Sequence, residues 1–148
     1  MVAANLGYNS RMPAPKNPNA SDFYVYCIEA NGRVFYVGHG RSKRAAYRVS
    51  YMKTQIKREA EGKVPHWNLH TRVMRCLHEK GIDSYVWYKK WALTKEEATQ
   101  EEAVQIGRLR SIGAILANCQ HNEGGPPEES IIQFVLFGTV SQASGRLP

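Results

Sequence analysis

The order of hydrophobic and polar positions predicts a small mixed domain. Between residues 23 and 37, aromatic and β-branched residues flank Asn31-Gly32, which is typical of a β-hairpin. Further along, apolar residues recur at three- and four-residue spacing, as on one face of a helix. The order β-β-α-α-β-α predicts an α/β fold of the α+β type, with a small, mainly antiparallel three-stranded sheet flanked by helices. We expect helices at 42–61, 67–80 and 94–110, and the third strand at 84–91.

Capping residues define where two of these helices begin. Ser42 is expected to cap the first helix, and Thr94 with Glu97 forms a capping-box pattern before the third. Gly81 is expected to end the second helix. The segment 130–140 fits a strand or a helix equally well. The buried stripe of the first helix is expected to comprise Ala45, Val49, Met52 and Ile56.

The hairpin allows two registers. A two-residue Asn31-Gly32 loop pairs Ala30 with Arg33. That register is expected to leave Tyr26 and Tyr36 on opposite faces. A three-residue loop that includes Ala30 instead pairs the two tyrosines directly. The second register alone builds one site from both phenols, and the sequence does not choose between them.

Composition divides the chain into three parts. Residues 1–22 mix Asn, Pro, Ala and Ser and are expected to form a flexible N-terminal arm. Residues 23–125 hold the predicted elements and are expected to form one domain, as the length of 148 residues suggests. Residues 126–148 are assigned to a C-terminal extension of unknown role.

The charge balance points to a polyanionic partner. The chain has 20 Lys and Arg against 13 Asp and Glu, a formal charge of +7, which favours nucleic acid over a membrane surface. No apolar run approaches the roughly 20 residues of a membrane span. The N-terminus does not have the pattern of a secretory signal. Three cysteines do not suggest a disulfide framework, so a cytoplasmic location is expected.

Much of the positive charge precedes or lies on the first helix. Arg44 and Arg48 share one line of this helix, directly after the Gly38-x-Gly40 turn. Two guanidinium groups placed in this way can clamp a phosphate, and a solvated helix face is an equally good interpretation. The glycines can also let backbone N–H groups approach a phosphate.

Glu102 is the most informative residue. It falls within the apolar stripe that Ala98, Ile106 and Leu109 define on the third predicted helix. An ionised carboxylate there is costly unless it is paired or binds a metal. Two interpretations follow: an ion pair with an arginine, or a ligand for a hard cation that keeps most of its waters, such as Mg²⁺.

Other metal-binding or nucleophilic residues are weaker candidates. Cys76 with His78, and Cys119 with His121, have a spacing that does not favour a zinc site, since residues two apart on a helix do not face each other. Cys27 alternates with apolar strand residues and is interpreted as packing. His66 and His70 are expected to be capping or surface residues.

Together these residues resemble the GIY-YIG nuclease superfamily. Tyr24-Val25-Tyr26 and Tyr36-Val37-Gly38 stand where the family has its two tripeptides, and Arg44 matches the arginine of the following helix. The helix with Glu102 is similar to the glutamate helix of the family. Asn118, before Gly124-Gly125, is similar to its terminal asparagine. The resemblance covers roughly residues 23–125.

The resemblance implies a metal-dependent endonuclease that hydrolyses phosphodiester bonds of DNA, which is expected to be double-stranded. Glu102 would hold one Mg²⁺ or Mn²⁺ ion. Tyr26 would be the general base or would orient the attacking water, with Tyr36 assisting, and Asn118 would help to order the site. Arg44 would stabilise charge on the scissile phosphate. The residues expected to bind nucleic acid are Arg41, Lys43, Arg48, Lys53, His39 and His70.

The chain departs from the family pattern at two positions of the expected site. Tyr24 stands in place of the first glycine, and a larger side chain there is expected to narrow the site. Arg48 stands where the family often has a histidine. If that histidine helps proton transfer, His39, Tyr47 or His70 must substitute, or Tyr26 acts unaided.

These departures leave a second functional hypothesis, a catalytically decayed module that binds nucleic acid. An RNA-processing role is a third. For an active enzyme, a phage, a mobile element or bacterial repair or restriction is the expected setting. A homodimer would serve a double-strand cut, which needs two active sites or two visits.

Overall fold

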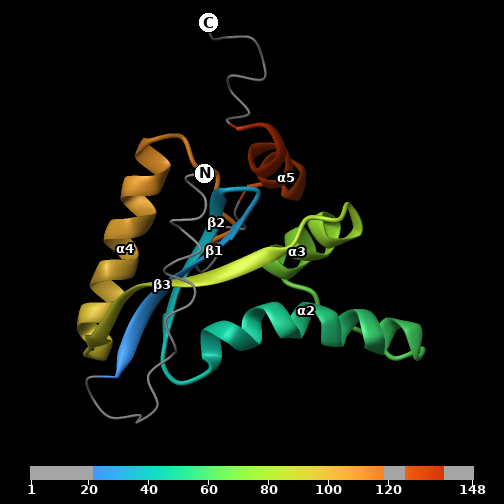
Figure 1. Cartoon of the computed structure of the whole chain (residues 1–148), viewed down its shortest axis with the longest axis horizontal. Coiled ribbons are helices and arrows are strands. Elements are labelled where there is room, and N and C mark those ends of the chain that lie inside the picture. Colours follow the sequence, from blue (N-terminus) through green and yellow to red (C-terminus); the bar gives the residue numbers. More distant parts are fainter. Residues whose placement is uncertain (1–21, 119–125, 139–148) are drawn as a thin grey trace, which may run out of the picture.

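The predicted strands form one antiparallel sheet. The computed structural model describes residues 22–118 and 126–138. Within these residues the sheet has three strands in the order β2-β1-β3, and four helices flank it (Figure 1). The expected α+β fold class is therefore confirmed. The elements are β1 (Phe23–Ala30), β2 (Arg33–Gly40), α2 (Arg44–Ala60), α3 (Leu69–Glu79), β3 (Ser84–Leu93), α4 (Lys95–Ser111) and α5 (Glu128–Phe137).

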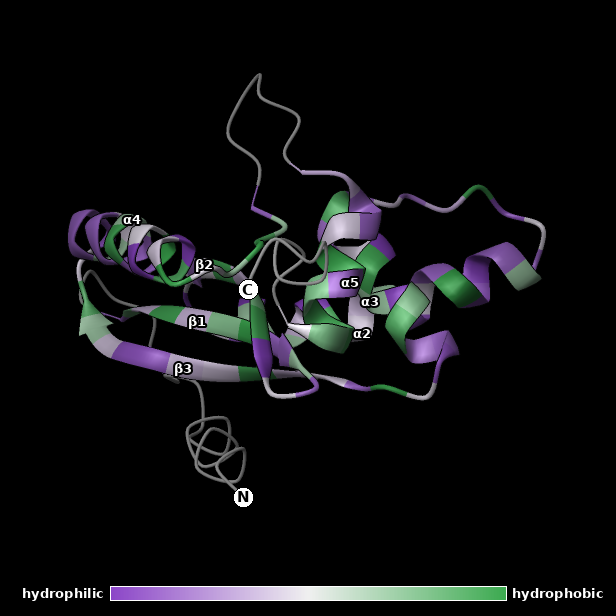
Figure 2. Ribbon diagram, turned by 90° about the horizontal axis from the view of Figure 1, so that it is seen from above, coloured by the Kyte–Doolittle hydropathy of each residue, from purple (hydrophilic) through white to green (hydrophobic). Residues whose placement is uncertain are grey.

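Strand β1 is the central strand and is buried on both faces. Tyr24, Tyr26 and Ile28 belong to a core with α2, α3 and α5, whereas Val25 and Cys27 belong to a core with α4. Figures 1 and 2 show α2, α3 and α5 gathered together, apart from α4. The alternation of a β-strand thus separates two cores, one on each face of the sheet.

The turn between β1 and β2 is a two-residue loop. Asn31 and Gly32 have φ values of 54° and 76°, both in the left-handed region that a type I′ turn requires. Ala30 pairs with Arg33 across the turn. The three-residue loop is therefore not formed.

A β-bulge next to this turn moves Tyr36 onto the face of Tyr26. Ile28 pairs with Tyr36, and Phe35 is an extra residue in β2 at the point where the register shifts. The rings of Tyr26 and Tyr36 lie with centroids 6.2 Å apart. The expectation that a two-residue loop separates the two tyrosines is wrong, because one extra residue reverses the alternation of every residue beyond it.

Helix α2 is capped by a side chain from the sheet. The expected cap, Ser42, has a φ of 55° and lies one residue before the N-cap position, Lys43, which makes no side-chain cap bond. The Tyr24 hydroxyl instead accepts a hydrogen bond from the Ala45 amide at 3.1 Å and donates one to the Ser42 carbonyl at 2.7 Å. The prediction that Ser42 caps this helix is therefore wrong. The predicted stripe is confirmed, with Ala45 and Met52 buried and Val49 and Ile56 half-buried.

The capping box of α4 is confirmed. The Glu97 amide donates to the Thr94 hydroxyl at 3.1 Å, and the Thr94 amide donates to the Glu97 carboxylate at 2.8 Å. Helix α3 has its own box from Asn68 and Thr71, so it begins at Leu69 instead of residue 67. These local bonds position α4, and with it Glu102.

The segment 128–137 forms a helix that shares the main core. In α5, Ile131 and Val135 are fully buried together with residues of β1, α2 and α3. The Val135 carbonyl accepts hydrogen bonds from Asn31 and Arg33, each at 2.9 Å. Part of the expected C-terminal extension thus packs on the hairpin. None of the helices in 22–118 and 126–138 is long and apolar enough to span a bilayer.

Thr94→Ala is expected to lower the free energy of unfolding by about 1 kcal/mol, because it leaves an amide at the start of α4 without its partner. Urea denaturation measures this change. Thr99→Ala is the matched control: Thr99 is exposed within the same helix and donates only to the Lys95 carbonyl. Its replacement should be neutral or slightly stabilising, so equal losses in both variants would contradict the capping role.

Candidate functional site

A cavity of about 630 Å³ opens at the end of β2, which is an edge strand of the sheet. Strand β2 pairs with β1 on one side, and its last residues approach α2 and α4. Six of the residues singled out from the sequence line this cavity: Tyr36, His39, Arg41, Arg44, Arg48 and Glu102. The fold therefore gathers side chains from β2, α2 and α4 at one place.

Two glycines of β2 make room for the groups that surround the cavity. Gly38 pairs with Tyr26, and a Cβ at position 38 would lie 2.6 Å from the Tyr26 hydroxyl oxygen. A Cβ at position 40 would lie 2.9 Å from Cδ of Arg44. Real Cβ atoms do not approach other atoms so closely. The buried Tyr26 ring thus explains the glycine at position 38, whereas the close atoms at position 40 belong to the exposed Arg44 side chain.

Tyr26 lies behind the cavity and holds Arg48. Its side chain is fully buried, and its hydroxyl accepts a hydrogen bond from Nε of Arg48 at 3.2 Å. Burial raises the pKa of Tyr26, and the nearby Arg48 opposes this shift only in part. Burial also raises the pKa of Tyr36, which lines the cavity. Both phenols are therefore neutral near pH 7.

Arg48 keeps its charge beside these phenols. Burial lowers its pKa, but the adjacent Tyr26 and Tyr36 outweigh that effect, and the net shift is upward. The guanidinium lies between the Tyr26 hydroxyl and the cavity. The position that often carries a histidine in the GIY-YIG pattern is thus filled by a permanent cation.

His70 supports Tyr36 from within the core. The two rings have centroids 4.4 Å apart at an interplanar angle of 31°. His70 is buried, so the expectation of a capping or surface residue is wrong for it. Burial lowers its pKa to about 4, and the charge of Arg48 acts in the same direction. His70 therefore packs behind Tyr36 as a neutral ring.

Glu102 meets a histidine, and not the arginine that an ion pair was expected to supply. Its Oε1 contacts Nδ1 of His39, and both side chains are about one-quarter exposed. Residue 39 points to the α4 face because it alternates with Gly38 and Gly40 along β2. This contact uses only one carboxylate oxygen of Glu102, so the second oxygen is a candidate ligand for a cation.

The neighbouring Glu101 bonds to residues outside the cavity wall. Its carboxylate accepts hydrogen bonds from Gln105 at 2.6 Å and from Lys90 at 3.3 Å. The Gln105 bond and the Lys90 charge lower its pKa. Adjacent positions on α4 thus carry two different carboxylates, and Glu102 is the one in the cavity wall.

The residues present fit a loosely held hard cation. At the cavity wall Glu102 supplies a carboxylate, and carboxylate oxygens are the ligands that hard cations prefer. Within the described ranges, no group of three or more His, Cys, Asp or Glu residues could hold a metal. A cation bound here would therefore keep most of its waters, as Mg²⁺ commonly does.

Of the cysteines, Cys27 and Cys76 lie among the described residues, and neither adds a metal centre or a nucleophile to this picture. Cys27 is buried, and burial raises its pKa to about 12, which agrees with packing. Cys76 is a free thiol on α3. Cys119 and His121 lie outside the described residues.

Asn118 closes the open edge of β2. Its side-chain oxygen accepts a hydrogen bond from the Val37 amide at 3.0 Å, and its side-chain nitrogen donates to the Val37 carbonyl at 2.6 Å. The Ala117 amide donates to the Phe35 carbonyl at 2.6 Å. Asn118 thus replaces a neighbouring strand and holds the backbone between Tyr36 and Gly38.

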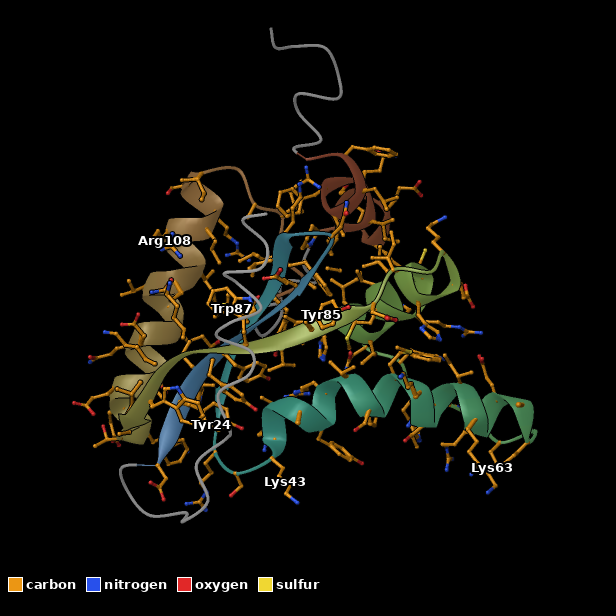
Figure 3. All side chains as sticks on the ribbon, in the orientation of Figure 1. Tyr24, Lys43, Lys63, Tyr85, Trp87 and Arg108 are labelled. Atoms are coloured by element: carbon orange, nitrogen blue, oxygen red, sulfur yellow. The ribbon has the colours of Figure 1, made fainter. Side chains whose placement is uncertain are left out.

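The other basic residues surround the cavity to different degrees. Arg41 lies over the Phe23 ring, 5.4 Å from its centroid, and lines the cavity. Figure 3 shows Lys43 at the start of α2, pointing away from the sheet. Lys53 is exposed further along α2 and does not line the cavity. Lys95 does line it and was not foreseen, because its position at the start of α4 does not by itself show which elements lie opposite.

Comparisons with known proteins give no match. No family model matches the sequence, no curated protein is significantly similar to it, and no solved structure matches its fold. The functional residues are therefore argued from the sequence pattern and from the geometry of the cavity.

Gly38→Ala is expected to lower the free energy of unfolding by about 1–3 kcal/mol, because the buried Tyr26 ring has no room to move. Gly40→Ala should leave stability close to that of the wild type, since the exposed Arg44 side chain can swing away. Urea denaturation of both variants checks this difference. Similar stability of the two would show that the Tyr26 contact does not constrain β2.

His70 should make stability depend on pH. Its folded-state pKa of about 4 lies below the ordinary value of 6.5, so the unfolded chain binds the proton first as the pH falls. The contribution of His70 is complete above about pH 6.5 and is lost toward pH 4. Compared with His70→Phe, the wild type should lose on the order of 2 kcal/mol more between pH 7 and pH 4.5. Parallel stability curves for the two proteins would refute the buried neutral ring.

Proposed function

We propose that this chain is a metal-dependent DNA endonuclease. The observation that carries the proposal is the single cavity in which Glu102, Tyr36 and Arg44 come together from three elements. A carboxylate can hold a cation, guanidinium groups can stabilise charge on the phosphate, and a phenol can orient the attacking water, so together these groups suit phosphodiester hydrolysis. The resemblance to the GIY-YIG superfamily supports the proposal, since these three residues are among those that carry it.

Arg44 and Arg48 bind the scissile phosphate. Both guanidinium groups reach the cavity, and Arg48 is held in place by its bond to Tyr26. Negative charge builds up on the phosphate oxygens as water attacks phosphorus and the P–O bond to the leaving strand breaks. Fixed guanidinium groups stabilise that charge without having to reorganise.

Tyr36 orients the attacking water as a neutral phenol. Of the two tyrosines, Tyr36 lines the cavity, whereas Tyr26 is fully buried behind it. The raised pKa of both phenols disfavours the role of general base for either. Tyr26 acts through Arg48 and is a positioning residue.

His39 accepts the proton of the attacking water. Of the three substitutes considered for the missing histidine, His39 lines the cavity, His70 is buried in the core and Tyr47 lies outside the cavity wall. Nδ1 of His39 faces the Glu102 carboxylate, which leaves Nε2 to take the proton. The carboxylate stabilises the imidazolium that results.

Glu102 would hold the cation, Mg²⁺ or Mn²⁺. When bound, the cation supplies Lewis-acid stabilisation of the charge on the phosphate. The chain itself supplies the carboxylate from α4, and the imidazole of His39 on β2 lies beside it. Asn118 keeps this part of β2 in place through the Val37 backbone.

Glu102→Gln is expected to lower Mg²⁺- or Mn²⁺-dependent nicking of supercoiled plasmid at least about 100-fold, because the carboxylate that holds the cation is lost. Binding of DNA in EDTA should be retained. Glu101→Gln is the matched control, since Glu101 is adjacent on α4 but bonds to Lys90 and Gln105. Wild-type cleavage by Glu102→Gln would rule out the proposed site.

A catalytically decayed module that binds nucleic acid is the second candidate. Arg48 in place of the histidine favours it, because a guanidinium cannot act as a base. Salt-dependent binding of DNA without nicking in either Mg²⁺ or Mn²⁺ would select this module over the enzyme. For an active enzyme we expect a cytoplasmic setting in a bacterium or a phage-infected cell, with a homodimer as one route to a double-strand cut.

A further inference from the structure

A second hollow of about 370 Å³ adjoins the cavity along α2 and the start of α3. Its lining residues are Arg44, Tyr47, Arg48, Tyr51 and Asn68. Arg44 and Arg48 also line the cavity that holds Glu102, so the two spaces share one wall. A chain of nucleotides bound at the cavity can therefore continue into this hollow.

Two tyrosines form the aromatic wall of the hollow. Tyr47 and Tyr51 follow Arg44 at helical spacing, so all three lie on one side of α2. Their rings have centroids 6.0 Å apart at an interplanar angle of 51°. The Tyr51 hydroxyl donates to the His66 carbonyl at 3.2 Å, which holds its ring in place.

Tyr47 is the member of this pair that is free to meet a ligand. Tyr47 is 61% exposed, so its ring is accessible to a ligand. Arg44 and Arg48 supply positive charge beside it. Exposed aromatic rings next to arginines are the groups that bind unpaired nucleotides, the rings by stacking on bases and the arginines by gripping phosphates.

We infer that this hollow binds an unpaired nucleotide next to the scissile phosphate, with its base stacked on Tyr47. In a continuous duplex each base is covered on both faces by its neighbours, so the ring has nothing to stack on. The preferred substrate is then DNA with an unpaired nucleotide at the cutting point, and not a continuous duplex. This inference rests on the proposed function and narrows its substrate class.

The test measures binding in EDTA, so that cleavage plays no part. One probe is a continuous DNA duplex, and the other is the same duplex with one unpaired 2-aminopurine nucleotide. The wild type should bind the second probe about tenfold more tightly and quench its fluorescence by stacking. Tyr47→Leu should lose both effects, whereas Tyr47→Phe should keep both because its ring can still stack.

Tyr85→Leu is the matched control. Tyr85 is a 56% exposed tyrosine on β3 and lines neither the cavity nor the hollow, so its replacement should leave both effects unchanged. Equal binding of the two probes by the wild type, or full preference retained by Tyr47→Leu, would overturn the inference and leave the nuclease proposal standing. Failure to bind either probe would overturn both. Tighter binding of an RNA strand of the same sequence would contradict DNA as the substrate.

Discussion

The contact between the Tyr26 ring and the bare backbone of Gly38 is the constraint on which the candidate site depends. The two residues pair directly across β1 and β2, and a side chain at position 38 would occupy the space of the ring. With the ring held there, the Tyr26 hydroxyl reaches Arg48, and the adjacent Tyr36 forms the cavity wall. The bulge at Phe35 makes this arrangement possible, because it brings Tyr36 to the same face.

The cavity also draws on the opposite face of the sheet. His39 alternates with the two glycines along β2 and therefore meets Glu102 of α4. Strand β2 is an edge strand, and Gly38 and Gly40, which have no Cβ atoms, leave little bulk between the two faces at this point. Side chains from opposite faces of the sheet thus line one cavity. Asn118 stabilises the edge that would otherwise leave Val37 without a partner on that side.

How far the sequence predicted these features depends on the distance between the partners. The Asn31-Gly32 turn and the Thr94–Glu97 capping box join residues within a few positions, and both could be predicted from the sequence. The cap of α2 was not, because Tyr24 supplies it from β1 across the fold. The same applies to His70, whose place behind Tyr36 follows from how α3 packs on the sheet. The sequence of the segment around α5 fitted a strand and a helix equally well. The structure shows a helix, which packs on the hairpin.

The sequence by itself determined the order of the elements, the stripe of α2 and the unusual place of Glu102 on an apolar face. These properties follow from fixed helix and strand periods, which any run of residues displays locally. Only the tertiary structure decided that Tyr36 shares a face with Tyr26, and that His39 is the partner of Glu102. A single extra residue in β2 moves each following side chain to the other face of the sheet. The period-two pattern of a strand does not reveal a bulge in the sequence, because the packing of both cores selects it.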